Sequence, residues 1–170
     1  ARGCAYVYAG GRAVSPRESA FCDLGIGYFA GMPLPVIYPA VFIVIIALIL
    51  SRSVFGTHVY AVGGNREAAR FSGIKIPRVE IIVYAISEFI SGFAGIVLAA
   101  RMTSGQPTVG IGFELDAIAA CVLGGVSMSG GIGHIGGSMI GALVIGIINN
   151  GLNLMNVNSF WQLIAKGMVI

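Results

Sequence analysis

Long uncharged apolar stretches dominate the chain and predict membrane-spanning helices. Residues 36–50 contain no charged side chain, and with their flanks they supply about 18 residues, enough to cross roughly 30 Å of hydrocarbon at about 1.5 Å per residue. The pattern predicts a second span over 79–100 and a third apolar helix over 138–153, and a further, truncated helix over 159–170. It therefore predicts an all-α protein, a polytopic transmembrane helical bundle.

One apolar segment is too short to cross a bilayer. Residues 114–124 have a helical pattern and end in the doublet Gly124-Gly125, after which a glycine-rich linker leads to the third span. Irregular backbone is tolerated at membrane depth only where it lines a cavity or is buried in protein. We therefore expect a broken or re-entrant helix at 114–124.

Charge orients the predicted spans. The polar segment 51–78 contains one acidic residue, Glu67, and five basic residues, which are Arg52, Arg66, Arg70, Lys75 and Arg78. Positive charge accumulates in cytoplasmic loops, so we expect 51–78 to be cytoplasmic. Residues 1–35 then form an external, periplasmic loop, in which turn signals separate short β-like pieces such as 5–8.

A short helix is predicted inside the cytoplasmic loop, over 65–72. Asn65 can cap its start, the following alanines favour helix, and Gly73 is a natural residue to end it. Such a helix between two spans can be a rigid handle through which a soluble partner moves membrane helices, or an ordinary solvated loop helix. The residues alone do not decide between these.

The composition excludes a soluble globular protein. Of the 170 residues, 56% are hydrophobic and 10% charged, and the mean hydropathy is +0.90, whereas a soluble domain carries about a quarter charged residues. The net charge of +3 does not indicate nucleic acid, because no run of Lys and Arg with interleaved aromatics occurs.

The first methionine is Met32 and the chain stops within an apolar run, so we expect both ends to be truncated.

Cofactor, metal and catalytic motifs are weak in this sequence. Residues 131–136 match G-x-G-x-x-G, but no acidic residue follows Asp116 to hold a dinucleotide ribose, so a tight linker is the preferred interpretation. The three cysteines form no metal-ligand cluster. Glu114 and Asp116 point in different directions on a helix, which disfavours a paired-carboxylate site, and the preferred interpretation is that they stabilise the helix N-terminus. We expect no cofactor, no metal and no enzymatic activity.

Several polar side chains interrupt the predicted spans. Glu88 lies near the middle of the second span, where a carboxylate costs on the order of 2.5 to 3.5 kcal/mol and should face protein or water. Asn149, Asn150 and Asn153 place amides on the third apolar helix. Each can be a structural hydrogen-bonding group or part of a polar pathway, and amides suit the hydroxyl groups of a sugar.

Three stretches carry a resemblance to a known family. They are 60–74 (YAVGGNREAARFSGI), 113–131 (FELDAIAACVLGGVSMSGG) and 149–154 (NNGLNL). Together they resemble the inner-membrane permeases of bacterial ABC importers for ribose and related monosaccharides, which share a broad family with branched-chain amino acid permeases. The resemblance extends over the whole chain and corresponds to the C-terminal half of such a permease, a multi-pass protein of the bacterial plasma membrane.

The resemblance implies a function and partners. A permease of this kind conducts sugar by alternating access, powered by a partner ATPase, and receives the sugar from a periplasmic binding protein. It works with a second permease subunit, here expected to be a second copy. A different class remains open, the ion-coupled secondary transporter with broken helices, which could use Glu88 as a proton site. An intramembrane enzyme is a third class, poorly supported by the residues.

The resemblance also implies two sets of site residues. The residues expected to couple the permease to the ATPase are Gly64, Asn65, Glu67, Ala68, Ala69, Ser72 and Gly73. Those expected to line or gate the pathway are Glu88, Asp116, Gly124, Gly125, Ser127, Gly130, Gly131, Asn149, Asn150 and Asn153.

Overall fold

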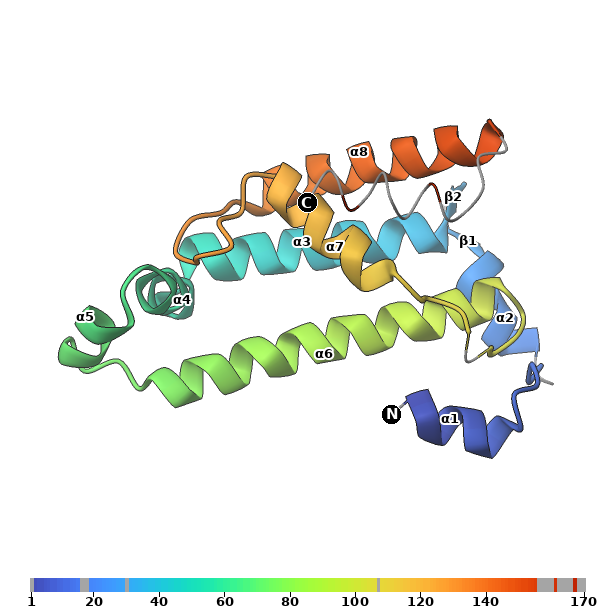
Figure 1. Cartoon of the computed structure of the whole chain (residues 1–170), viewed down its shortest axis with the longest axis horizontal. Helices are drawn as coiled ribbons and strands as arrows, with labels where there is room; N and C mark the ends of the chain where they lie inside the picture. Colours follow the sequence, from blue (N-terminus) through green and yellow to red (C-terminus); the bar gives the residue numbers. More distant parts are fainter. Residues whose placement is uncertain are drawn as a thin grey trace. The chain divides into compact units, whose positions relative to one another are not determined.

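The computed structural model confirms an all-α membrane protein (Figure 1). It describes residues 2–15, 19–29, 31–106, 108–155, 161 and 167. Three of the helices in this part of the chain are long and apolar enough to span a bilayer: α3 (Leu34–Arg52), α6 (Ile76–Arg101) and α8 (Ile135–Leu154). The further helix expected over 159–170 lies outside the described residues, apart from 161 and 167.

All three spanning helices begin earlier than the apolar pattern predicts. Because α3 starts at Leu34, Pro39 lies inside it, beyond its first turn. Pro39 cannot donate the usual backbone hydrogen bond, a loss that membrane helices tolerate when neighbouring groups compensate. α6 starts at Ile76 and takes Pro77 into its first turn, where a proline is unstrained.

The chain divides into two compact units, each described separately. The first unit contains Ala1–Leu48 and Glu80–Val109. Its short elements are α1 (Arg2–Ala9), α2 (Ser19–Ile26), β1 (Tyr28–Phe29) and β2 (Met32–Pro33). The two strands pair antiparallel, with Phe29 opposite Met32, and lead directly into α3. The expected β-like piece at 5–8 is wrong, because these residues lie in α1, where no second strand pairs with them.

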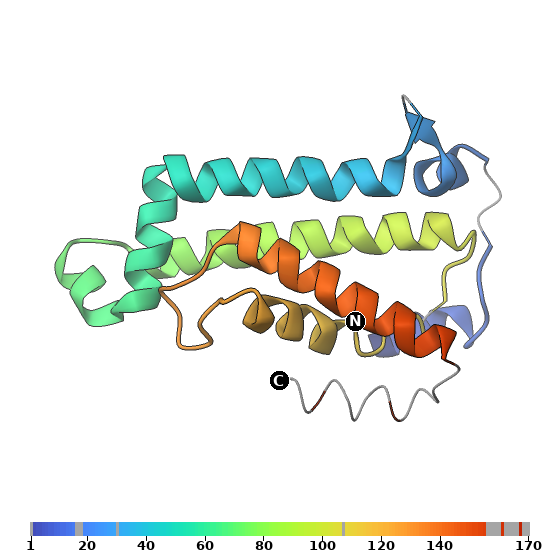
Figure 2. The ribbon, with the colours of Figure 1, turned by 90° about the horizontal axis from the view of Figure 1, so that it is seen from above.

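α3 and α6 run side by side in this unit (Figure 2). The ring of Phe93 on α6 contacts two rings of α3 edge-on, those of Tyr38 and Phe42, each with a centroid separation of 5.3 Å. Aromatic pairs favour this geometry over face-to-face stacking. At the end of α6, the backbone of Gly25 in α2 packs directly on Ala100, which is fully buried.

The second unit contains Ile49–Val79 and Gly110–Ile170. Besides α8 it holds α4 (Val54–Gly64), α5 (Arg66–Phe71) and α7 (Phe113–Leu123). α4 is a helix of 11 residues that the sequence did not predict within 51–78, and Ser53 caps it by accepting a hydrogen bond from the Gly56 nitrogen at 3.1 Å. The helix α7 lies where the sequence predicts a short helix at 114–124, and its broken or re-entrant course in the membrane stays a prediction.

α7 and α8 form an antiparallel pair held at very short backbone separation. A Cβ atom added at Gly124 would lie 2.5 Å from the carbonyl oxygen of Gly137, and one added at Gly141 would collide with the carbonyl oxygen of Ala120. Beyond them, Ile145 is buried with Ala119 and Ala120. Small residues four apart thus allow the two helices to touch, as the Gly137/Gly141 spacing predicts.

This packing gives the first prediction. Replacing Gly141 with Ala should destabilise the detergent-solubilised protein by about 1–3 kcal/mol, because the added methyl group forces the helices apart. Gly146 lies on the same helix with nothing within 4 Å of an added Cβ. Gly146→Ala should therefore be neutral or stabilise by about 0.5–1 kcal/mol through helix propensity. Thermal unfolding of both variants measures this, and equal effects would contradict the packing argument.

Candidate functional site

The helix predicted at 65–72 is present as α5. Asn65 caps its start, its Oδ1 accepting a hydrogen bond from the Ala68 nitrogen at 2.9 Å. At the other end the Ser72 hydroxyl donates to the Ala68 carbonyl oxygen at 2.9 Å. Gly73 follows with φ +81°, a left-handed conformation that favours glycine. The sequence signals for the start and end of this helix are therefore confirmed.

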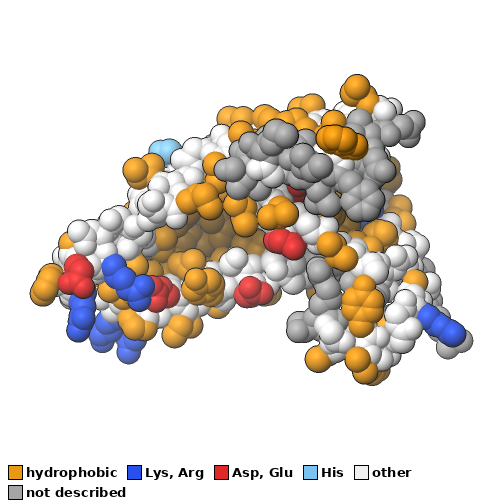
Figure 3. Space-filling model, viewed as in Figure 1, with side chains coloured by type: hydrophobic (Ala, Val, Ile, Leu, Met, Phe, Trp, Pro, Cys, Tyr) orange, Lys and Arg blue, Asp and Glu red, His pale blue; other side chains and the backbone are white. Residues whose placement is uncertain are grey.

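α5 presents most of its surface to solvent. Of the seven residues expected to couple to an ATPase, Ala69 is buried and the other six are exposed. The sequence interpretation missed Phe71, whose side chain is 85% exposed on the same helix. Lys and Arg side chains gather around α5 and the start of α6 (Figure 3). An exposed aromatic ring beside basic side chains is a surface that a protein partner can bind.

The last two residues of α4, Gly63 and Gly64, pack against the linker between α7 and α8. A Cβ atom added at Gly63 would lie 2.6 Å from the Gly131 nitrogen, and one added at Gly131 would lie 2.6 Å from the Gly64 Cα. A Cβ atom added at Gly130 would lie 2.7 Å from the Gly63 carbonyl oxygen. We call this contact of Gly63-Gly64 with Gly130-Gly131 the glycine junction.

The linker at the glycine junction is itself an ordered turn. The Ser127 nitrogen donates to the Ile132 carbonyl oxygen at 2.9 Å, and the Gly130 nitrogen donates to the Ser127 carbonyl oxygen at 3.1 Å. Gly130 and Gly131 both have positive φ, at +90° and +75°. The Tyr60 hydroxyl of α4 donates to the Gly133 carbonyl oxygen at 2.8 Å and fixes the turn to α4.

A cavity of about 400 Å³ adjoins the glycine junction. Its lining comes from α4, the end of α7, the linker and the start of α8, and includes Tyr60, Gly63, Cys121, Ser127, His134 and Ser138. The backbone of the turn therefore borders open space on one side and α4 on the other. Movement of α4 would change the shape of this cavity.

Two of the expected pathway residues meet at the opposite end of the α7–α8 pair. The Asn149 Nδ2 donates to the Asp116 Oδ2 at 3.2 Å. Both side chains are half-buried, and the Asn149 Oδ1 is buried with no hydrogen-bond partner among the described residues. A carboxyl group and an amide side by side can accept from and donate to the hydroxyl groups of a polar solute.

The remaining expected pathway residues are not part of this pair. Gly124 ends α7 and Gly125 follows with φ +80°. Asn150 and Asn153 are exposed on α8, and Glu88 is exposed on α6, where it has no hydrogen bond or ion pair within the described part of the chain. The structure thus brings together Asp116 with Asn149, and Gly64 with Gly130 and Gly131.

The described residues contain no group of three or more His, Cys, Asp or Glu side chains able to hold a metal ion. Cys4, Cys22 and Cys121 are free thiols.

Known proteins resemble the chain throughout. Residues 8–170 match the family described as the permease component of branched-chain amino acid transport systems. The ribose import permease protein of Bacillus subtilis (strain 168) is 47% identical over 99% of the chain and 53% of its own length. The L-arabinose transport system permease protein of Escherichia coli (strain K12) is 43% identical over 99% of the chain and 52% of its own length.

The chain spans about half the length of the curated relatives it matches. No solved structure matches it. The family match covers nearly all of the chain, and three of its described helices can span a membrane. The chain therefore belongs to the family of branched-chain amino acid transport system permease components, and it is a multi-pass protein of the bacterial inner membrane.

Proposed function

We propose that the chain is part of the permease of an ABC importer that carries ribose or a related monosaccharide. The relatives named for ribose and arabinose import support the substrate class. The observation that carries the mechanism is the glycine junction, because it joins the end of α4, which leads directly into the helix expected to bind an ATPase, to the linker expected to gate the pathway.

The proposal requires partners. The sequence contains no G-x-x-x-x-G-K-[ST] phosphate-binding loop, so ATP hydrolysis is assigned to an ATPase subunit that binds α5 from the cytoplasm. A periplasmic binding protein delivers the sugar to the outer face, and a second permease subunit completes the pathway. The basic segment 51–78 supports the cytoplasmic location of α5.

A displacement of α5 can pass through α4 to the linker between the membrane helices α7 and α8. Asn65 both ends α4 and caps α5, so the two helices share a terminus without a flexible connection. Displacing α4 then presses on the ordered turn at 127–132, because neither side of the glycine junction has a side chain that could yield. Small shifts at such packed contacts are converted into discrete movements. We assign alternating access to movement of α7 and α8 driven in this way.

Asp116 and Asn149 are assigned to the sugar pathway. Their hydrogen bond lies at the end of the α7–α8 pair that is farther along both helices from the linker. Opening of the pair would offer a carboxyl group and an amide to sugar hydroxyl groups, whereas closure returns them to each other. Exchange between these hydrogen bonds provides weak, reversible binding, which transport requires because the solute must leave again.

Phe71→Ala tests the docking surface. In a complete permease carrying this sequence, the change should weaken binding of the ATPase subunit by about tenfold, the size of effect typical of an aromatic anchor at an interface. Val54→Ala is the control, since Val54 is 72% exposed at the start of α4, outside α5. Co-purification and ATP-driven sugar uptake measure both. Wild-type binding by Phe71→Ala would reject the assignment of α5.

Gly131→Ala tests the glycine junction. The added Cβ would press on Gly64, so sugar uptake should fall at least about tenfold while the ATPase subunit still binds and hydrolyses ATP. Gly112→Ala is the control, because Gly112 has the same left-handed backbone with nothing within 4 Å of an added Cβ. An equal loss of uptake in the two variants would show that backbone strain, and not the junction, is the cause, and wild-type uptake by Gly131→Ala would reject the role of the junction.

Asn149→Leu tests the assigned pathway residues. Uptake should fall by about fivefold, since the hydrogen bond to Asp116 contributes about 1 kcal/mol. Asn150→Leu removes an amide from the neighbouring, exposed position and controls for the added apolar volume on α8. Uptake that is reduced equally in both variants, or in neither, would contradict a specific role for the Asp116–Asn149 pair.

A further inference from the structure

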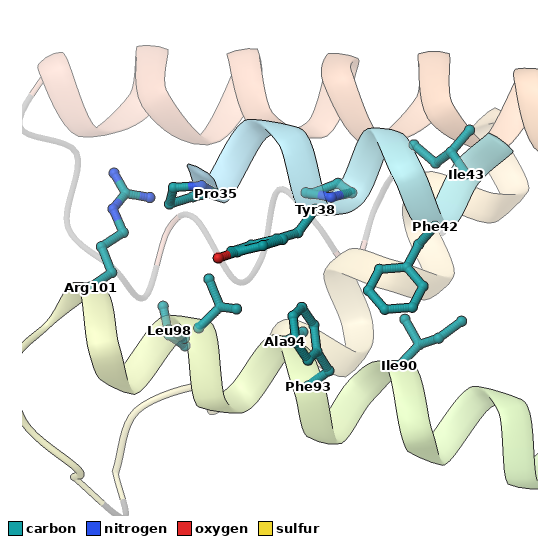
Figure 4. A pocket seen from close by; sticks show the side chains of 11 residues that line it. Pro35, Tyr38, Phe42, Ile43, Ile90, Phe93, Ala94, Leu98 and Arg101 are labelled. Carbon is teal, nitrogen blue, oxygen red and sulfur yellow. The ribbon is translucent and has the colours of Figure 1, made fainter. Parts of the chain in front are cut away.

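We propose that the first unit binds an anionic phospholipid between α3 and α6. A cavity of about 390 Å³ lies there, and apart from Arg101 its lining residues are apolar or aromatic. Both helices contribute to the lining, which includes Tyr38, Phe42, Ile90, Phe93 and Leu98 (Figure 4). The volume falls within the range of about 300–1,000 Å³ that is typical of small-molecule sites.

One end of the cavity is polar and the rest is not. The Arg101 side chain extends toward Pro35 at this end, and the hydroxyl group of Tyr38 is directed toward the same end (Figure 4). Neither the Arg101 guanidinium nor the Tyr38 hydroxyl has a hydrogen-bond or ion-pair partner within the described part of the chain. A ligand that fits must therefore be anionic or polar at one end and hydrocarbon along the remainder.

The position of the cavity along two membrane-spanning helices indicates that its ligand is a lipid. Arg101 is the last residue of the spanning helix α6, where a charged side chain reaches the membrane–water interface. The apolar walls continue from there along both spans, at the depth of lipid acyl chains. A phospholipid placed with its phosphate at Arg101 sets one acyl chain against Tyr38, Phe42 and Phe93 without disturbing the bilayer.

The headgroup, and not the acyl chain, must provide the selectivity. Lipid tails are as apolar as the cavity walls, so moving a tail from the bilayer into the cavity gains little free energy. A guanidinium binds phosphate oxygens by two parallel hydrogen bonds, and the tyrosine hydroxyl can donate a further one. A basic side chain at the interface favours anionic over zwitterionic lipid by about fivefold.

Photocrosslinking in a complete permease carrying this sequence tests the proposal. The probe is phosphatidylglycerol with a photoreactive group in one acyl chain, and adducts are mapped by peptide mass spectrometry. We expect adducts within residues 35–43 and 90–98. Unlabelled phosphatidylglycerol should compete about fivefold better than phosphatidylcholine with the same acyl chains.

Two substitutions separate the headgroup from the acyl chain. Arg101→Gln should abolish the preference for phosphatidylglycerol, whereas Arg101→Lys should retain most of it. Ala94→Phe fills the cavity and should remove the adducts while Arg101 is intact. Arg78→Gln is the control, at the opposite end of α6 and outside the cavity lining, and it should leave the preference unchanged.

Three results would overturn the proposal. Absence of adducts within 35–43 and 90–98 would reject lipid binding in the cavity. Equal competition by the two lipids would reject headgroup recognition. An unchanged preference in Arg101→Gln would place the anionic site elsewhere.

Discussion

Backbone-to-backbone packing at glycine is the constraint on which the second unit depends. At Gly63, Gly124, Gly131 and Gly141 an added Cβ atom would meet another segment's backbone within the distance that real atoms avoid. These contacts join α4 to the linker and α7 to α8. Backbone cannot move aside as a flexible side chain can, so the contacts transmit displacement with little loss. A protein that must carry motion from one surface to another gains from contacts of this kind.

The polar groups of the second unit are arranged around this packed backbone. Tyr60 holds the linker turn through the Gly133 carbonyl group, and Asn149 binds Asp116 at the far end of α7 and α8. The first hydrogen bond holds α4 to the linker, and the second joins α7 to α8 directly.

The sequence predicted those features that depend on local chemistry. The capping by Asn65, the stop at Gly73 and the apolar lengths of the spans were sufficient to place α5 and three membrane helices. α4 was missed because its glycines, Gly56, Gly63 and Gly64, are typical of loops. They occur there because two of them contact other backbone, Leu50 for Gly56 and Gly131 for Gly63. Tertiary contact thus outweighed propensity.

Contacts between residues far apart in the chain could not be predicted from one sequence. Nothing local pairs Asp116 with Asn149, 33 residues away, and the doublets Gly63-Gly64 and Gly130-Gly131 gave no sign that they touch. The exposure of the Phe71 ring on α5 depends on tertiary packing, which a single sequence does not show. The role of each residue in coupling or transport remains a prediction that depends on the whole permease.

Hydrogen exchange in the assembled transporter tests the central claim most directly. The ATPase subunit is expected to contact α5 alone in this chain, yet the rigid connection predicts that its binding changes exchange of the backbone amides of the turn at 127–132. The Ser127 and Gly130 amides, which close the turn by hydrogen bonds, should respond together with those of α5. Changes confined to α5, with the turn unaffected, would contradict transmission through the glycine junction.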